Sequence, residues 1–275
     1  MLRFVGNNIE LSVAVCALAL LVACGIFGPL IWQVDPNAVD LLDSLTGPSL
    51  AHPMGSDDVG RDILSRFNQG ARISLSVATV VTLTSMIVGG LLGIIAGLMR
   101  GWIDEVISTA MDAILAFPPL IFAIAIAIAL GASVTSAAIG ITVAAVPFYA
   151  RLLRSDVLKI REMTYVEAAI AAGIPFPSII IRHIVPQLYS TLLIEAAAVF
   201  GFSILTLAAL GFVGLGAQPP TPEWGNMITE GLPYSLTGQW WLGVFPGLGV
   251  LIASVATGLI ADRLRDFYDP KSHAR

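Results

Sequence analysis

The chain has 275 residues, of which 56% are hydrophobic and only 12% are charged, and its mean hydropathy is +0.86. Soluble domains carry roughly 25% charged residues, so this composition excludes an ordinary soluble protein and indicates a chain that lies in lipid. The net charge of −5 also argues against a nucleic-acid-binding protein. Cys16 and Cys24 fall in the same apolar run, so we expect packing residues rather than a disulfide or a metal site.

Apolar runs of about 20 residues are long enough to cross a bilayer core ~30 Å thick. The sequence therefore predicts an all-α membrane protein with six transmembrane helices, in the ranges 9–32, 73–99, 106–130, 135–153, 189–215 and 240–261. Eleven of the fourteen Lys and Arg residues lie in loops or tails on one side of these runs. Because basic residues stay on the cytoplasmic side, we predict that the N- and C-termini are cytoplasmic.

The hydrophilic segment from 33 to 70 is predicted to lie outside the membrane. It contains HPMGSDDVGRDILSR, in which Asp57 or Asp58 can cap a short surface helix. The apolar residues of that helix share one face and are Val59, Ile63, Leu64 and Phe67. His52 beside these two acids has no recurrent metal-ligand spacing, so we expect a structural turn and helix cap, with no metal.

A second Pro- and Gly-rich segment, 216–235, is also predicted to lie outside. Its acids, Glu223 and Glu230, are expected to be solvated loop residues. Three tryptophans fit an interfacial aromatic belt, namely Trp224, Trp240 and Trp241.

Glycines recur every four residues in the second span, at positions 89, 93, 97 and 101. Such a stripe lets a lipid-embedded helix approach a neighbour closely. The pattern predicts helix packing, and the partner helix can belong to this chain or to another.

Ionisable groups and a proline pair interrupt two of the apolar runs. Asp112 lies near the predicted cytoplasmic end of the third span, Pro118 and Pro119 near its middle, and Glu195 about two turns into the fifth. The prolines are expected to bend the third span. For the two acids, and for the bend at Pro118, a purely structural role and a role in a pathway or gate both remain open.

The stretch EAAIAAGIPFPSIIIRHIVP, 167–186, is too broken by Gly and Pro to span a membrane. Thr164 and Glu167 have the spacing of a capping box, so a helix is expected to start there with Thr164 as its cap. Gly173 in a left-handed conformation would end it, and a second short helix can follow over 178–185. So short a helix is not stable alone and must pack against another surface. That surface can be the membrane helices of this chain or a groove of another protein, and the sequence leaves both possibilities open.

Here the sequence resembles the permease subunits of binding-protein-dependent ABC importers. Glu167-Ala168-Ala169, then Gly173 and Pro186, is similar to their EAA loop, although the usual ending Ile-x-Leu-Pro is His183-Ile184-Val185-Pro186 here. That ending, together with GARIS, DAILAFP and LGFVGLGAQPPTPEWGNM, resembles the C-type subunit of the dipeptide, oligopeptide and nickel branch. The similarity runs in order from His52 to Pro270.

The resemblance implies a type I transmembrane subunit in a bacterial or archaeal inner membrane. Its coupling residues would be Glu167, Ala168, Ala169 and Gly173. Its partners would be membrane lipid, a second homologous permease, two cytoplasmic ATPases and a periplasmic or lipid-anchored solute-binding protein, with no cofactor. The domain organisation would be a first span and periplasmic segment (1–70), a transmembrane domain (71–262) with its EAA loop at about 154–186, and a cytoplasmic tail (263–275).

The energy source is not in this chain, and neither is an enzyme site. Neither lysine, Lys159 or Lys271, follows a glycine, so no P-loop is present and the permease is expected to be non-enzymatic. Intramembrane charges and the Pro118 bend alone would also fit a stand-alone secondary transporter or channel. The branch suggests di- or oligopeptides as cargo, with a nickel chelate or another small solute as the alternative.

Overall fold

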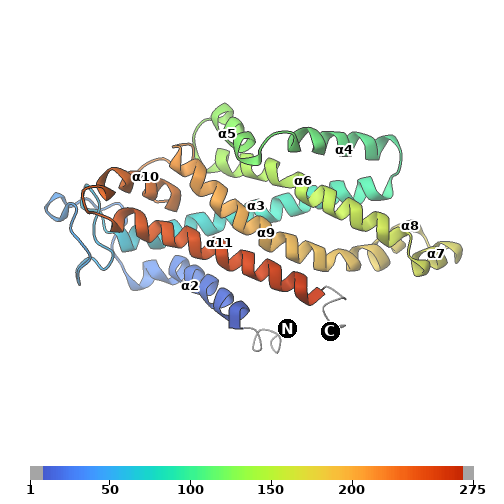
Figure 1. Cartoon of the computed structure of the whole chain (residues 1–275), viewed down its shortest axis with the longest axis horizontal. Coiled ribbons are helices and arrows are strands. Elements are labelled where there is room, and N and C mark those ends of the chain that lie inside the picture. The colour runs from blue at the N-terminus through green and yellow to red at the C-terminus, as the bar shows by residue number, and fades with distance from the viewer. Residues whose placement is uncertain (1–8, 269–275) are drawn as a thin grey trace.

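Five long apolar helices form the body of the computed structural model, which describes residues 9–268 (Figure 1). They are α2 (Ile9–Ile31), α3 (Ile63–Leu98), α6 (Val134–Arg161), α9 (Tyr189–Phe212) and α11 (Trp241–Tyr268). Each is long and apolar enough to cross a bilayer. A sixth span exists if α4 (Trp102–Leu115) and α5 (Pro119–Leu130) are taken together. The predicted all-helical membrane fold is thus confirmed, with one of its six spans broken.

The bundle has two distinct ends, seen at the right and left of Figure 1. At the end that we call the α7 end lie α7 (Thr164–Ala171), α8 (Phe176–Ile179), a π-helical turn (Ile180–Ile184) and a 3₁₀ turn (Val185–Leu188). At the opposite α10 end lie α10 (Trp224–Ser235) and the segment 32–62, which contains a 3₁₀ turn (Leu41–Asp43).

The start of α3 corrects the predicted surface helix. The cap is Asp62, whose Oδ2 accepts the backbone N–H of Ser65 at 2.8 Å, and the helix then runs without interruption into the span. Asp57 instead folds a turn, because its Oδ1 accepts the N–H groups of Val59 and Arg61 at 3.0 and 2.9 Å. The residues from Ile63 onward therefore belong to the membrane helix itself.

The glycine stripe packs α3 against α6, so its partner lies in this chain. A Cβ atom placed on Gly89 would lie 2.4 Å from the carbonyl oxygen of Val146, and one on Gly93 would lie 2.5 Å from that of Ala150. Both distances are shorter than any real carbon contact. Only glycine therefore permits this approach of the two backbones. Gly101, the last of the predicted stripe, instead adopts a φ of +101° in the turn before α4.

The predicted aromatic belt is wrong for two of its three tryptophans. Trp224 is fully buried between α3 and α10, and its indole N–H donates to the carbonyl of Phe67 at 3.2 Å. Trp241 is also buried and donates to the carbonyl of Ser56 at 3.1 Å. Trp240 is exposed, as a belt residue would be. The two buried rings instead anchor the α10 end to the spans.

Candidate functional site

The helix α7 begins at the predicted cap residue itself, Thr164, so its N-cap lies one residue earlier. Its N-cap is Met163, whose carbonyl accepts the N–H groups of Val166 and Glu167 at 2.9 and 3.1 Å, and no side chain in the described part of the protein caps the helix. Thr164 is the first helical residue, so the predicted capping box does not form. The cause is the short link from α6, because only Glu162 and Met163 separate the two helices.

The end of α7 follows the prediction. Gly173 has a φ of +75°, its N–H donates to the carbonyl of Ile170 at 3.0 Å, and the N–H of Ile174 donates to that of Ala169 at 3.2 Å. These two bonds form a Schellman motif, which satisfies carbonyls that the helix end leaves free. Since a left-handed φ disfavours every residue with a Cβ, the chain reverses here because of Gly173.

The two faces of α7 have different surroundings. Val166 and Ala169 are buried against an apolar cluster of α6 and of the turns before α9, formed by Leu153, Val157, Ile160, Ile179, Ile184 and Leu188. Glu167 and Ala168 face outward, and the exposed outer surface continues through Tyr165, Ile170 and Ile174. Of the predicted coupling residues, Ala169 therefore packs on the protein's own helices, whereas Glu167, Ala168 and Gly173 are open to a partner.

The α7 end is tied to the spans through α6 on one side and α9 on the other. Arg161, the last residue of α6, donates from Nη1 to the carbonyls of Gly97 and Leu98, at 3.1 and 2.7 Å, and so caps the end of α3. On the other side the predicted short helix 178–185 is not separate. It begins at Phe176 and continues past Pro186 as π and 3₁₀ turns, which lead directly into α9.

The proline pair breaks the third span instead of bending it. Pro118 is the N-cap of α5 and Pro119 its first residue, and the axes of α4 and α5 differ by 89°. Proline lacks an N–H and clashes with the preceding turn, so two in succession end α4 at Leu115. The predicted kink is thus a corner, which leaves α4 lying alongside α6 (Figure 1).

Asp112 lies on α4 across from α6. Its Oδ1 is 3.8 Å from Nε of Arg151, and the two side chains are 62% and 64% exposed. One turn away, Arg154 makes a closer, two-pronged pair with Asp104, with N–O distances of 2.5 and 2.7 Å. Asp112, Arg151 and Arg154 line a cavity of about 270 Å³ between α3, α4 and α6. The pair of Asp104 and Arg154 fixes α4 against α6. The longer and more exposed pair of Asp112 and Arg151 lines the cavity.

Glu195 lies in a different pocket. Its side chain is half-buried on α9 and lines a hollow of about 170 Å³ with Phe148, Ala198, Val199 and Phe202. The structure therefore does not bring Asp112 and Glu195 into one cavity. α6 lines both, with Arg151 in the first and Phe148 in the second, and these residues are one helical turn apart.

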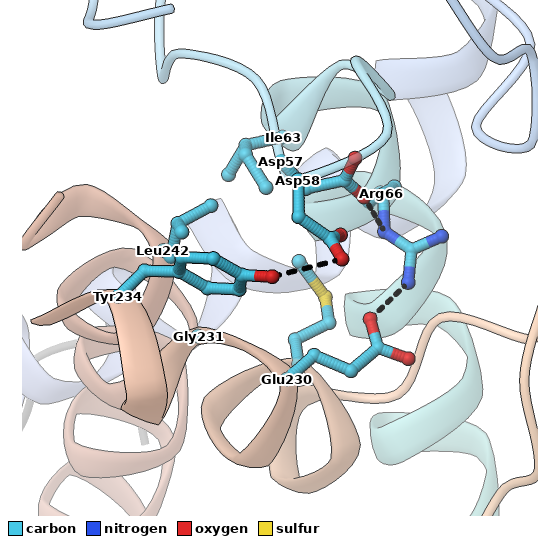
Figure 2. Close-up of a pocket in the computed structure, with 9 residues that line it drawn as sticks. Asp57, Asp58, Ile63, Arg66, Glu230, Gly231, Tyr234 and Leu242 are labelled. Carbon is cyan, nitrogen blue, oxygen red and sulfur yellow. Dashed lines mark hydrogen bonds and ion pairs between the residues drawn. The ribbon is translucent and has the colours of Figure 1, made fainter. Parts of the chain in front are cut away.

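The most connected polar cluster, at the α10 end, is one that the sequence did not reveal. Figure 2 shows Arg66 between Asp57 and Glu230, with Tyr234 donating to Asp58 at 3.2 Å. Arg66 is 3.7 Å from Asp57 and 2.9 Å from Glu230, and Arg61 is 2.5 Å from Asp57. Glu230 is thus a paired residue, which corrects the expectation of a solvated loop acid.

Glu223 is likewise not a solvated residue. It is buried, and its carboxylate caps α10 by accepting the N–H groups of Gly225 and Asn226 at 2.9 and 3.1 Å. Ser74 of α3 donates to the same carboxylate at 3.1 Å. Burial raises the pKa of Glu223, and these three bonds oppose that shift. Glutamate is not among the residues that usually cap a helix, so the sequence carried no clear signal for this role of Glu223.

Comparisons with known proteins agree on the class of this chain. The profile of the family described as "Binding-protein-dependent transport system inner membrane component" matches residues 89–273. The chain belongs to this family. It is a non-enzymatic, multi-pass inner-membrane permease that works with separate ATPase and binding-protein subunits.

Among its relatives is the probable D,D-dipeptide transport system permease protein DdpC of Escherichia coli, 39% identical over 97% of this chain and 89% of that protein. The dipeptide transport system permease protein DppC of Alkalihalophilus pseudofirmus is 41% identical over 90% of this chain and 81% of that protein. The glutathione transport system permease protein GsiD of Pectobacterium atrosepticum is 35% identical over 98% of this chain and 89% of that protein. An inward-facing structure of the MetNI methionine ABC transporter has the same fold, with a TM-score of 0.60 and 18% identity over 73% of this chain and 95% of that one.

Proposed function

We propose that this permease imports short peptides and that α7 is the element through which ATPase subunits move it. The peptide cargo is suggested by the names of its relatives, which include dipeptide permeases 39% and 41% identical to this chain. The coupling role rests on one observation, the division of α7 into a buried face and an exposed face. Because the buried face of α7 is packed on its own bundle, a partner that binds the exposed face can move α7 together with the bundle.

The outward residues of α7 suit contact with another protein. Ala168 and Gly173 are small and lose little side-chain freedom on binding, while Ile170 is 52% exposed beside them. The side chain of Glu167 makes no hydrogen bond or ion pair within residues 9–268, so it is free to pair with a basic residue of a partner. In this proposal the α7 end is cytoplasmic and the α10 end periplasmic, in line with the charge asymmetry of the sequence.

The pathway would be completed by a second, homologous permease. The face that carries Asp112, Arg151 and Glu195 exposes ionisable groups within the apolar spans, where exposure to lipid is costly. We place this face toward the second permease and the pathway. The corner at Pro118 then separates α4, which borders the pathway, from α5. ATP-driven rocking of the two permeases would open and close the path between them.

A crosslinking experiment tests the coupling role with a matched pair of positions. In a permease with Cys16 and Cys24 replaced by alanine, Ala168→Cys should crosslink to an ATPase subunit in the assembled, importing complex. Ala169→Cys is the control, because that position is only 7% exposed and points into the bundle. Absence of an ATPase adduct from position 168 in an active complex would reject the coupling role.

The cargo is tested separately, by uptake into proteoliposomes that contain the complex and its binding protein. Dipeptide uptake that needs ATP supports the proposal. Uptake of a nickel chelate instead would leave the coupling role intact and change the substrate. Uptake by the purified chain alone, without ATPases, would point to a stand-alone carrier.

A further inference from the structure

Glu195 lies in a pocket whose composition matches one kind of ligand. The pocket, here called the Glu195 pocket, is lined by Glu195 together with Phe148, Ala198, Val199 and Phe202 and has a volume of about 170 Å³. Its two phenyl rings meet edge to face, with centroids 6.0 Å apart. The carboxylate is the one ionisable group among these lining residues.

The carboxylate of Glu195 lacks a partner of its own. Within residues 9–268 it makes no hydrogen bond and no ion pair. Arg265 of α11 acts on it only through space and makes its own ion pair with Asp262, at 4.0 Å. A half-buried carboxylate among apolar side chains is costly unless a positive charge comes to it. The pocket is therefore electrostatically incomplete in the isolated chain.

A second unsatisfied polar group lies beside it. Tyr149 follows Phe148 on α6, is fully buried and packs against Val199, and among the described residues, 9–268, its hydroxyl finds no hydrogen-bond partner. It is close enough to Glu195 for the two groups to interact electrostatically. Buried hydroxyls in proteins are nearly always bonded. The region around Glu195 therefore contains two polar groups, its carboxylate and the Tyr149 hydroxyl, whose hydrogen-bonding capacity is unused within residues 9–268.

A carboxylate flanked by aromatic rings is a binding site for an ammonium group. The carboxylate neutralises the charge, and the ring faces attract the cation through their quadrupoles. We propose that the Glu195 pocket binds a primary ammonium group carried on an apolar chain, namely the free amino terminus of the peptide in transit. This inference rests on the proposed function, since it names the subsite for that cargo.

The size and position of the pocket limit what it holds. Pockets that enclose drug-sized ligands measure about 300–1,000 Å³. At about 170 Å³ the Glu195 pocket takes an amino terminus and part of the first side chain, but not a whole peptide. Arg151, one turn along α6 from Phe148, places a guanidinium on the same side of that helix. A peptide held by its amino terminus would thus lie next to a group that attracts its carboxylate.

Thiol labelling of the assembled complex tests the charge preference. The permease carries alanine at positions 16 and 24 and the substitution Ala198→Cys, one turn from Glu195 on its own face of α9. It is treated with cationic 2-aminoethyl methanethiosulfonate and with neutral methyl methanethiosulfonate. We expect the ratio of the two rates to exceed by about tenfold the ratio at Ala197→Cys, on the opposite side of the helix. Glu195→Gln should abolish the excess, whereas Glu105→Gln on α4 should preserve it.

Protection from labelling tests the ligand itself. L-phenylalanylglycinamide, which has a free amino terminus and no carboxylate, should slow the labelling of Ala198→Cys, and its N-acetyl derivative should not. Equal protection by both, or the same cation preference in Glu195→Gln, would overturn the proposal. A third outcome would also overturn the proposal: the second permease no longer copurifies with the Glu195→Gln variant, while the preference for the cationic reagent is unchanged. In that case Glu195 pairs with the second permease and not with the peptide.

A measurement without cysteine substitution guards against a misfolded variant. L-phenylalanylglycinamide should raise the midpoint of thermal unfolding of the unmodified complex, and Glu195→Gln should lose that rise while keeping the baseline midpoint. An identical rise in both proteins would contradict the subsite. Dipeptide uptake by the unmodified complex is measured in parallel. If uptake is absent while the cation preference persists, the peptide function fails and the ammonium subsite stands.

Discussion

Arg66 and Glu230 form an ion pair with an N–O distance of 2.9 Å, although 164 residues separate them in the sequence. The side chain of Arg66 is 1% exposed and that of Glu230 is 26% exposed. Arg66 also donates to the carbonyl of Pro220, at 3.3 Å. The pair therefore fastens the start of α3 to α10 and to the segment before it.

We expect Arg66→Met to destabilise the permease by about 3 kcal/mol, at the lower end of the range for breaking a buried pair. The loss is not larger because Arg61 remains 3.4 Å from Glu230 and supplies part of the missing charge. Denaturant titration in a fixed detergent measures the change. Arg72→Met, at an exposed position of the same helix, is the control and should alter stability by less than about 0.5 kcal/mol. Equal losses in the two variants would contradict the role of the pair.

Removing the side-chain hydroxyl at the start of α6 and at the start of α7 should affect stability differently. Ser133 caps α6, because its Oγ accepts the N–H of Ser136 at 3.0 Å, so Ser133→Ala should cost about 1 kcal/mol. Thr164 makes no such bond in α7, so Thr164→Ala should be near neutral for stability. Thermal unfolding of the two variants distinguishes them. A larger loss at position 164 would mean that the capping box forms after all.

The left-handed turn after α7 predicts that Gly173→Ala weakens coupling. No atom of residues 9–268 outside the immediate turn lies within 4 Å of a Cβ placed on Gly173, so the cost is conformational, about 1–2 kcal/mol. This cost falls on the last turn of α7, and we expect substrate-stimulated ATPase activity of the complex to drop severalfold while the chain still inserts. Gly258→Ala is the matched control, since that site is equally open and has no positive φ. Normal ATPase stimulation in Gly173→Ala would contradict this prediction.

The α10 end should become less stable as the pH rises. Hydrogen bonds from His52 to Asp62 and to Asp43 raise the pKa of the imidazole, against a smaller opposing effect of burial. A raised pKa means that the folded state favours the protonated form. The contribution is thus complete below the ordinary value of about 6.5 and is lost as the pH passes through the raised pKa. The difference in thermal midpoint between the native protein and His52→Gln should be largest near pH 5 and shrink above pH 7. A difference that grows with pH would refute this assignment.

The local parts of the fold were predictable and the distant pairings were not. The spans follow from apolar length, and Gly173 ends its helix because no other residue tolerates that φ as readily. Glu230, by contrast, was expected to be solvated because its partner Arg66 lies far away in the sequence. Spacing along the chain carries no information about such a contact.

Motif spacing also failed where a neighbouring element changed the boundary. Thr164 and Glu167 have the spacing of a capping box, but after the two-residue link from α6 the N-cap of α7 is Met163, and Thr164 is the first helical residue. At Pro118 the proline pair indicated a bend, whereas its angle of 89° depends on how α5 packs on α6. Both candidate acids, Asp112 and Glu195, fall in apolar runs of the sequence, but only the structure assigns them to separate cavities.

The helical segment from Pro177 to Phe212 has 36 residues and connects α8, the π-helical turn and the 3₁₀ turn to α9 without an intervening loop. At 1.5 Å per residue its α9 portion of 24 residues is about 36 Å long, so tilting that helix by about 5° would move its far end by about 3 Å. The far tip carries Gly211, where a Cβ would lie 2.5 Å from the carboxylate of Glu223. Movement imposed at one surface of the membrane would thus reach the opposite surface through a single piece of backbone, with no relay of side chains in between.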